Sequence, residues 1–228
     1  MGKDSISRRD LIRNSVVAGG GLAALVSSGK ALAEACLATA PQGEGPFYPE
    51  GDLERDADLV QIQQGDPMAK GQVIFISGRV LDVDCRPIGG ALVEIWQCCF
   101  SGKYNHSEDP NPLELDPNFQ YWGRAHTDAD GKYLFRTIVP GHYPNGPGIY
   151  RPPHVHFKAH AKLHQSLTTQ MYFDPRGYDD PAVAAIVAKW NQYERVPQSL
   201  IVHFRPSPAG LDRGSKYGAF DITLKKIG

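Results

Sequence analysis

The sequence predicts an all-β fold: a two-sheet β-sandwich with long loops and one short surface helix. The first observation is the abundance of turn-forming residues, 24 glycines and 18 prolines among 228 residues, which exceeds average usage and argues against a helical bundle. The second is a series of eight short segments rich in Val, Ile, Phe and Tyr and bounded by Gly, Pro or Asp. The third is that only one stretch has helical periodicity. Many short strands with one helix are typical of two packed sheets.

The N-terminal 33 residues have the pattern of an export signal. Arg8 and Arg9 form a twin-arginine pair, a weakly apolar run extends from Val16 to Ser28, and Ala31-Leu32-Ala33 ends the segment. We therefore expect the twin-arginine machinery to export the protein to the periplasm or beyond, with cleavage after Ala33. The apolar run is short for a bilayer span. A short membrane anchor or an amphipathic start remains the alternative.

The rest of the chain, residues 34–228, contains no repeat, charge run or low-complexity linker, which predicts a single domain. Residues 34–70 are rich in Pro, Gly and Asp and predict an irregular N-terminal arm. Asp128-Ala129-Asp130-Gly131 separates two expected strands and predicts a hairpin loop with a positive φ at Gly131. The expected strands are Gln72–Asp82, Ala91–Cys98, Trp122–Thr127, Tyr133–Ile138, His154–Ala161, Leu167–Phe173, Leu200–Phe204 and Ala219–Leu224.

The helix is expected to begin after Asp180. Asp180 is a good N-cap, and a proline at the first helical position follows it. The apolar residues after it recur at i, i+3, i+4 and i+7, which predicts one apolar stripe. We expect a surface helix packed on a sheet through Val183, Ile186, Val187 and Trp190.

The net charge and the cysteine spacing argue against some classes of partner and of metal site. A formal net charge of −1 provides no field that would attract nucleic acid or an anionic membrane. The four cysteines include no C-x-x-C pair, which disfavours a cysteine zinc site. An exported protein can form disulfides, so a Cys36–Cys85 bridge and buried free thiols both stay open. Adjacent Cys98 and Cys99 would point to opposite faces of a strand.

The most specific local pattern is a pair of histidines after two prolines, His154 and His156. On an extended strand their imidazoles share one face and can converge on one ion. A lone H-x-H pair is more often structural, and no carboxylate stands at a spacing that completes a zinc or ferrous site. Tyr104 and Tyr143 lie in Gly- and Pro-containing loops, where a tyrosine is ordinarily a packing residue.

A longer series of motifs argues that these histidines and tyrosines are functional and not only structural. In order along the chain they are Ile76-Ser77-Gly78-Arg79-Val80, Val93-Glu94-Ile95, Gly102-Lys103-Tyr104, Pro140-Gly141-His142-Tyr143-Pro144, Arg151-Pro152-Pro153-His154-Val155-His156-Phe157 and Thr169-Gln170-Met171-Tyr172-Phe173. This order resembles the intradiol ring-cleavage dioxygenases, the family of catechol 1,2-dioxygenase and protocatechuate 3,4-dioxygenase. The resemblance extends from Ile76 to Phe173, and Gly45-Pro46-Phe47-Tyr48 is similar to the family's N-terminal arm.

The resemblance implies a mononuclear ferric site, with one Fe(III) per chain. It places the family's Arg and Gln beside the bound ring at Arg151 and Gln170. A trivalent ion can deprotonate a phenol whose free pKa is near 10, and hard oxygen donors favour ferric iron. The implied ligands are two tyrosinates and two imidazoles: Tyr104, Tyr143, His154 and His156.

The implied reaction is the cleavage of a catechol-type ring by O2. The metal acts as a Lewis acid on the bound catechol, one oxygen is inserted between the two hydroxylated carbons, and a muconate-type diacid results. Tyr143 would take a substrate proton, Arg151 would stabilise developing negative charge and Gln170 would orient the ring. The implied partners are the small-molecule catechol, O2, the export machinery and further subunits of a homo- or hetero-oligomer.

The chain departs from the family pattern in several places. Cys85 and Tyr121 stand where the family commonly has a small residue, and the loop after Tyr143 is shorter. No helical N-terminal extension is apparent, so the chain is nearer the iron-bearing subunit of protocatechuate dioxygenase or the compact exported members. Two alternatives stay open: a non-catalytic β-sandwich binding module, and a zinc hydrolase that uses His154 and His156.

Overall fold

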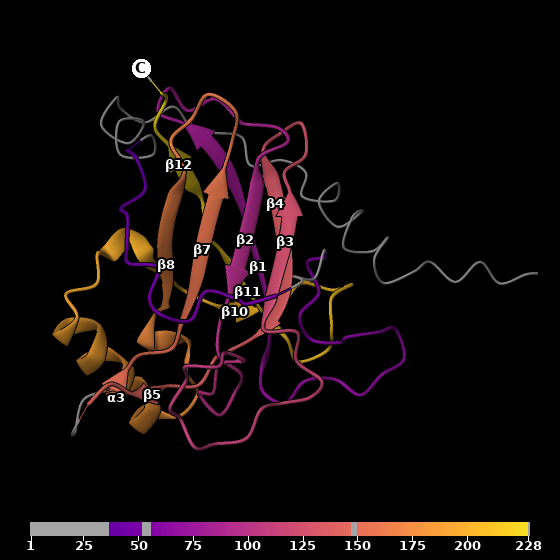
Figure 1. Cartoon of the computed structure of the whole chain (residues 1–228), viewed down its shortest axis with the longest axis vertical. Helices are drawn as coiled ribbons and strands as arrows, with labels where there is room; N and C mark the ends of the chain where they lie inside the picture. The colour runs from indigo at the N-terminus through magenta and orange to yellow at the C-terminus, as the bar shows by residue number, and fades with distance from the viewer. Residues whose placement is uncertain (1–36, 52–55, 147–149, 228) are drawn as a thin grey trace, which may run out of the picture.

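The computed structural model describes residues 37–51, 56–146 and 150–227, and the expected export signal, residues 1–33, lies outside them. Two five-stranded sheets face one another, as Figure 1 shows. Within the described residues no helix has the length and apolar character that a bilayer span requires. The predicted all-β, two-sheet architecture is confirmed.

The first sheet has the order β10-β11-β1-β12, with β4 paired to β1. The second has the order β3-β2-β7-β8-β9, and β5 and β6 form a separate two-stranded ribbon. The strands are β1 (Val73–Asp82), β2 (Leu92–Trp96), β3 (Trp122–His126), β4 (Lys132–Ile138), β5 (Tyr143–Pro144), β6 (Tyr150–Arg151), β7 (His154–His160), β8 (Leu167–Phe173), β9 (Ile201–Val202), β10 (Arg205–Pro206), β11 (Lys216–Ala219) and β12 (Ile222–Leu224).

The core lies between the two sheets and is built from alternating positions of their strands. Ile74 and Ile76 of β1 are fully buried, as are Val93 and Ile95 of β2. Side chains two apart on a strand share a face, so these residues point into the same layer. Burying each contributes roughly 1.5–3 kcal/mol. This layer makes the sandwich a rigid base for the loops at its ends.

The segment expected as one strand, Ala219–Leu224, is divided between two strands, β11 and β12. Each of them pairs with β1 in parallel, and both keep the same register along it. β11 pairs with the first half of β1 and β12 with the second half. Between them the carbonyl oxygen of Phe220 would lie 1.9 Å from a Cβ at Gly78, so only glycine fits there. Phe220 keeps one ladder bond, from its N–H to the Ser77 carbonyl at 2.8 Å.

Two further expectations are wrong. Asp128–Gly131 does not close a hairpin, because β3 and β4 belong to different sheets. The Asp128 carboxylate accepts from the backbone N–H groups of Asp130 and Lys132 at 2.9 and 2.8 Å, so the tight turn crosses between layers; Gly131 does have a φ of 75°. The expected strand Leu200–Phe204 is a 3-10 turn, η2 (Gln198–Leu200), followed by the two-residue β9.

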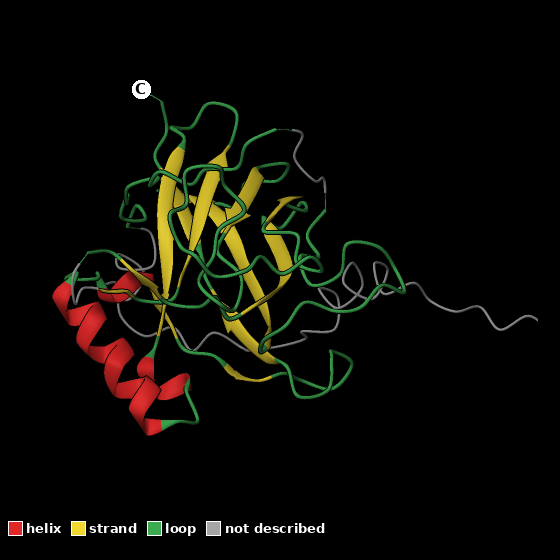
Figure 2. Cartoon of the chain, turned by 60° about the horizontal axis from the view of Figure 1, so that its bottom comes forward, coloured by secondary structure: helices red, strands yellow, loops and turns green. Residues whose placement is uncertain are grey.

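The predicted helix is α3 (Pro181–Tyr193), and the Asp180 side chain caps it by accepting from the Ala182 N–H at 2.8 Å. Its apolar stripe is not buried on a sheet as expected. Val187 is buried, whereas Val183 and Ile186 are 37% and 42% exposed. Figures 1 and 2 show the helix at one end of the sandwich, beside β5. A short 3-10 turn, η1 (Pro175–Gly177), links β8 to this helix.

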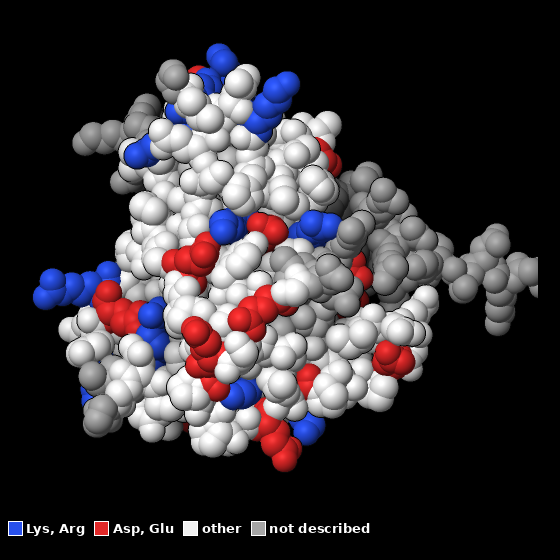
Figure 3. Space-filling view, viewed as in Figure 1, with Lys and Arg blue, Asp and Glu red and all other residues white. Residues whose placement is uncertain are grey.

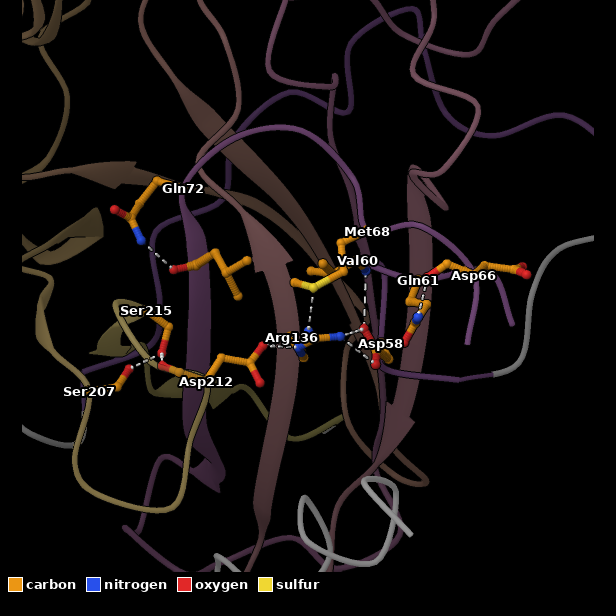
Figure 4. Close-up of polar contacts among 11 residues, drawn as sticks. Asp58, Val60, Gln61, Asp66, Met68, Gln72, Arg136, Ser207, Asp212 and Ser215 are labelled. Carbon is orange, nitrogen blue, oxygen red and sulfur yellow. Dashed lines mark hydrogen bonds and ion pairs between the residues drawn. The ribbon is translucent and has the colours of Figure 1, made fainter. Parts of the chain in front are cut away.

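Several long-range contacts fasten the irregular segments to the sandwich. The described part of the N-terminal arm forms one isolated β-bridge, between Asp58 and Arg136. The Arg136 side chain also forms an ion pair with the Asp58 carboxylate (Figure 4).

Cys98 and Cys99 are buried free thiols. Cys85 is disulfide-bonded; Cys36, with which the sequence left a bridge open, lies outside the described residues.

The charged surface is mixed in sign. Figure 3 shows acidic and basic side chains interspersed over the face that it displays. Such interspersion agrees with a formal net charge close to zero, and no field of one sign dominates that face.

Candidate active site at one end of the sandwich

The loop after β2 and the consecutive strands β5, β6 and β7 meet at the same end of the sandwich. β7 begins at His154, directly after Pro152 and Pro153, which cannot donate to a sheet ladder. β6 ends at Arg151 and β5 begins at Tyr143. The strand that precedes the Tyr104 loop, β2, pairs Trp96 with His156. The topology therefore places all the expected site residues near one another.

Close backbone approach brings the two tyrosine loops together. A Cβ on Gly102 would lie 2.3 Å from the carbonyl oxygen of His142, and one on Gly141 would lie 2.4 Å from the Gly102 nitrogen. The Gly141 N–H donates to the Cys99 carbonyl at 3.0 Å. Only glycines permit this contact. Their positions two residues before Tyr104 and Tyr143 explain why those two rings lie edge to face, with centroids 5.5 Å apart.

The structure brings the four expected ligand side chains into one cluster. The Tyr104 hydroxyl lies 3.2 Å from Nε2 of His156 and 3.4 Å from Nε2 of His154. The Tyr143 hydroxyl lies 3.5 Å from Nε2 of His154. Tyr104 and both histidines are buried, whereas Tyr143 is half-buried. Two oxygens and two ring nitrogens thus converge on one point.

These separations suit a single metal ion. Donor atoms about 2.0–2.2 Å from one ion lie about 3 Å from each other, which is close to the distances within the cluster. Among the described residues, no group of three or more His, Cys, Asp or Glu side chains is placed to hold a metal ion. A site at this position therefore depends on the tyrosines, and phenol oxygens with imidazoles favour a hard, highly charged ion.

The histidines are oriented for metal binding. Nδ1 of His154 lies 2.7 Å from the Pro152 carbonyl oxygen, so it carries the proton and leaves the Nε2 lone pair for the cluster. His156 is stacked on Trp96, with centroids 4.7 Å apart and planes at 10°. Its Nδ1 is buried and makes no hydrogen bond with the described residues.

Burial controls the protonation of the cluster. It lowers the pKa of His154 to about 3, and it lowers the pKa of His156, where the neighbouring His154 adds to the effect. It raises the pKa values of Tyr104 and Tyr143. The imidazoles are therefore neutral, which is their metal-binding form. A phenolate at either tyrosine requires a strong positive charge beside it.

Arg151 and Gln170 also lie together. The Arg151 Nη2 donates to the Gln170 side-chain oxygen at 2.7 Å, and the Tyr172 hydroxyl donates to the same oxygen at 2.8 Å. The Gln170 amide donates to the Gly43 carbonyl at 2.7 Å. Every polar atom of the Gln170 side chain thus has a protein partner. Gln170 fixes Arg151 and the arm, in addition to any contact with a substrate.

One residue of this network, Glu194, could not be identified as a site residue from the sequence. Oε1 of Glu194 forms an ion pair with Nε of Arg151 at 2.7 Å. Glu194 is the C-cap residue of α3 and stands 43 positions beyond Arg151 in a region without a family motif. Burial raises the pKa of Glu194, and the Arg151 guanidinium opposes that shift.

A small cavity opens beside Tyr143 and Arg151. Its volume is about 220 Å³; a cavity of about 150 Å³ can hold benzene, so one substituted ring fits. Its lining residues are Pro46, Phe47, Asp109, Pro110, Asn111, Pro112, Tyr143, Pro144, Asn145 and Arg151. A larger cavity of about 490 Å³ borders Tyr104 and Trp96, but neither histidine nor Arg151 lines it.

The chain is similar to curated dioxygenases. It is 43% identical over 136 residues to the protocatechuate 3,4-dioxygenase beta chain of Burkholderia cepacia, covering 58% of this chain and 57% of that one. It is 34% identical over 156 residues to catechol 1,2-dioxygenase 2 of Acinetobacter lwoffii, covering 62% and 54%. The chain therefore spans little more than half the length of these relatives.

Solved structures agree with these similarities. Catechol 1,2-dioxygenase from Pseudomonas arvilla C-1 superimposes with a TM-score of 0.58 at 30% identity, covering 82% of this chain and 62% of that one. The dioxygenase domain of a carbohydrate-binding fusion from Streptomyces sp. SirexAA-E has a TM-score of 0.58 at 28% identity, covering 83% and 99%. The model of the family described as "Dioxygenase" matches residues 43–226. The chain belongs to this family, the intradiol ring-cleavage dioxygenases.

Proposed function

We propose that the protein is a ferric-iron-dependent dioxygenase that cleaves a catechol-type ring between its two hydroxylated carbons, giving a muconate-type diacid. The observation that carries the proposal is the convergence of two phenol oxygens and two imidazole nitrogens within 3.2–3.5 Å. The ligands to one Fe(III) per chain would be Tyr104, Tyr143, His154 and His156. Bound there, the ferric ion would act as a Lewis acid that makes a coordinated catechol reactive toward O2.

The protein side chains have separate tasks in this proposal. Tyr143 is half-buried and borders the 220 Å³ cavity, so its oxygen is the one placed to take a proton from an entering catechol. The Arg151 guanidinium lines the same cavity and stabilises negative charge that develops on the substrate. Gln170 holds that guanidinium in place through the 2.7 Å hydrogen bond. Phe47 packs against Tyr104, with ring centroids 4.8 Å apart.

The substrate is proposed to be a catechol because the family and the relatives' names agree on aromatic diols. Those names include protocatechuate, catechol and hydroxyquinol dioxygenases. Oxygen uptake with catechol, 3,4-dihydroxybenzoate and hydroxyquinol, with identification of the product, tests this directly. Removal of iron should abolish the uptake, and added zinc should not restore it. Uptake that zinc restores would contradict the proposal.

The colour of the purified protein tests the ligand assignment. Charge transfer from tyrosinate to ferric iron should give a red-brown protein, whereas zinc or a metal-free module is colourless. Tyr104→Phe and Tyr143→Phe should each bleach or shift the visible band. Tyr193→Phe is the matched control, because Tyr193 is 64% exposed at the end of α3. If both site variants keep the wild-type spectrum, the ligand assignment is wrong.

We also propose that the protein is exported. The support is the twin-arginine pair Arg8-Arg9 followed by an apolar run and Ala31-Leu32-Ala33. Replacement of both arginines by lysine should retain the protein inside the cell, as measured by fractionation and N-terminal sequencing. Export of that variant at the wild-type level would contradict the proposal.

A further inference from the structure

Glu194 connects the C-terminal end of α3 to the candidate active site. Its Oε1 lies 2.7 Å from Nε of Arg151, and its Oε2 lies 3.4 Å from the Tyr172 hydroxyl. The side chains of Glu194 and Arg151 are only 18% and 24% exposed. Charge pairs with this degree of burial interact more strongly than surface pairs do.

The remaining contacts of Arg151 leave it little freedom. Its Nη2 donates to Gln170 at 2.7 Å and to the Tyr172 hydroxyl at 3.4 Å. The guanidinium is thus held at Nε by a carboxylate and at Nη2 by an amide and a phenol. Because Glu194 is the only carboxylate in this set, it is the only member that also offsets the charge of Arg151.

Aromatic contacts fasten α3 to the ribbon that carries Tyr143 and Arg151. Tyr150 of β6 is stacked on Trp190 of α3, with centroids 5.5 Å apart and planes at 27°. His142, next to Tyr143, lies 4.9 Å from the same indole. Trp190 is one helical turn before Glu194. The packing of α3 against this ribbon therefore places the Glu194 carboxylate next to Arg151.

The effect of the Glu194–Arg151 ion pair on substrate binding depends on the other charges around the 220 Å³ cavity. Among its described lining residues Arg151 is the only cation and Asp109 the only anion. The ammonium of the neighbouring Lys103 donates to the backbone carbonyls of Asp109 and Asn111 at 2.7 and 2.6 Å. Since Arg151 is already paired with Glu194, the described lining of the cavity offers no unpaired cation for a substrate carboxylate, and desolvating such a carboxylate without a partner is costly.

We propose that Glu194 positions Arg151 and neutralises its charge, so that the site selects catechols whose ring carries no carboxylate. The inference rests on the proposed dioxygenase function. Glu194 acts through Arg151 and is therefore a positioning residue. It also sets specificity, because the net charge that it leaves at the cavity discriminates between neutral and anionic rings.

The test compares two substrates of the iron-loaded protein, catechol and 3,4-dihydroxybenzoate. In the wild type, kcat/KM should favour catechol by at least about tenfold, about 1.4 kcal/mol. Glu194→Gln keeps the size of the side chain and removes its charge. It should raise the kcat/KM ratio of 3,4-dihydroxybenzoate to catechol about tenfold, mainly through a lower KM for the anionic substrate.

Two further variants separate this effect from a loss of structure. Glu194→Asp keeps the charge and should hold the ratio near the wild-type value, even where the absolute rates fall. Glu114→Gln removes an exposed carboxylate outside the network and should change neither the rates nor the ratio. A purely structural role of Glu194 would lower the rates for both substrates together and leave the ratio unchanged.

The outcomes are distinguishable. If the iron-loaded wild type cleaves neither catechol, 3,4-dihydroxybenzoate nor hydroxyquinol, the proposed function fails. If it cleaves 3,4-dihydroxybenzoate as well as catechol, or if Glu194→Gln leaves the ratio unchanged, the inference about Glu194 fails while the function stands. If Glu194→Gln does not fold, a wild type that cleaves 3,4-dihydroxybenzoate as well as catechol still contradicts the inference.

Discussion

Tyr121 occupies a backbone conformation that usually belongs to glycine. Its φ is 61°, and Cys85, the other departure from the family's small residues, has a φ of 62°. A non-glycine residue in this region costs of order 1–3 kcal/mol. Tyr121 offsets that cost through its side chain: the ring lies 4.9 Å from that of Phe119, and the hydroxyl accepts from the Asp116 N–H at 2.6 Å.

Tyr121→Gly should therefore destabilise the protein despite relieving the backbone. The relief is about 1–3 kcal/mol, whereas losing a buried aromatic side chain costs about 3–5 kcal/mol. From the middle of both ranges we expect the free energy of unfolding, measured by urea titration, to fall by about 2 kcal/mol. Tyr121→Phe, which removes only the hydrogen bond, should lose about 1 kcal/mol. A Tyr121→Gly protein as stable as the wild type would show that strain dominates at this position.

Asp174 makes stability depend on pH at acidic values. Hydrogen bonds from the Arg176 side chain, at 3.0 Å to each carboxylate oxygen from Nε, lower the pKa of this buried carboxyl, and the Arg176 backbone N–H adds a bond at 2.9 Å. A lowered folded pKa stabilises the protein above the unfolded value of about 3.9. That contribution is lost as the pH falls toward the folded pKa.

Asp174 is also the N-cap residue of η1, so Asp174→Ala should reduce the free energy of unfolding at pH 7 by about 1 kcal/mol, the usual cost of a lost N-cap. The difference in thermal midpoint between the variant and the wild type should shrink as the pH is lowered from 5 to 3. A difference that stays constant over this range would show that the carboxylate charge does not contribute.

At the scale of elements, the sequence predicts strands well where a strand buries one face. Leu167–Phe173 has the expected bounds, and the expected Gln72–Asp82 and His154–Ala161 differ from β1 and β7 by one residue. The pattern fails where burial does not determine the pairing. β5 and β6 have two residues each and no periodicity, and the Asp128 turn crosses between the sheets because long-range packing fixes which strands pair.

The residues of the candidate site, like the strands, could be predicted only in part from the sequence. The two histidines could be placed on one face from their spacing, and the family motifs added the two tyrosines, Arg151 and Gln170. Glu194 could not be predicted, because its position depends on where α3 ends and how the helix lies against β6. Likewise, the amphipathic pattern of α3 predicted burial on a sheet, whereas the helix packs at the end of the sandwich through Val187 and Asn191.

Trp190→Ala tests whether α3 braces the ribbon that carries Tyr143. The indole contacts Tyr150 and His142 but lies outside the main core. We expect kcat/KM for catechol to fall about tenfold while the thermal midpoint falls only slightly, since aromatic pairs contribute about 0.5–1.5 kcal/mol. Ile186→Ala, on the same helix and 42% exposed, should change neither value. An equal loss of activity in both variants would exclude a specific role for the indole.

At the scale of the whole molecule, Arg136 joins three distant parts of the chain (Figure 4). It lies on β4, is 3% exposed, and its Nη1 donates to both carboxylate oxygens of Asp58 in the arm at 3.0 and 2.9 Å. Its Nε donates to Asp212, near the C-terminal strands, at 2.7 Å. An earlier part of the same arm contacts the candidate site, where Phe47 packs against Tyr104 and the Gly43 carbonyl accepts from Gln170.

Arg136→Met should cost about 3–5 kcal/mol, because it leaves two partly buried carboxylates without their cation. Burial already raises the pKa of Asp58 although Arg136 opposes the shift, so the variant should raise it further. An acid with a raised folded pKa loses stability as the pH rises through that value. The loss measured by urea unfolding should therefore be larger at pH 7 than at pH 4.

Asp58→Asn completes a double-mutant cycle with Arg136→Met. If the pair is coupled, the double variant should be more stable than the sum of the two single losses predicts, by about 1 kcal/mol or more. Arg86→Met, at an arginine whose side chain is 75% exposed, is the control and should stay within about 0.5 kcal/mol of the wild type. Additive losses would mean that Arg136 stabilises the fold through Asp212 and through packing but not through Asp58, and that the backbone hydrogen bonds of Ala57 and Leu59 with Arg136 hold the arm in place.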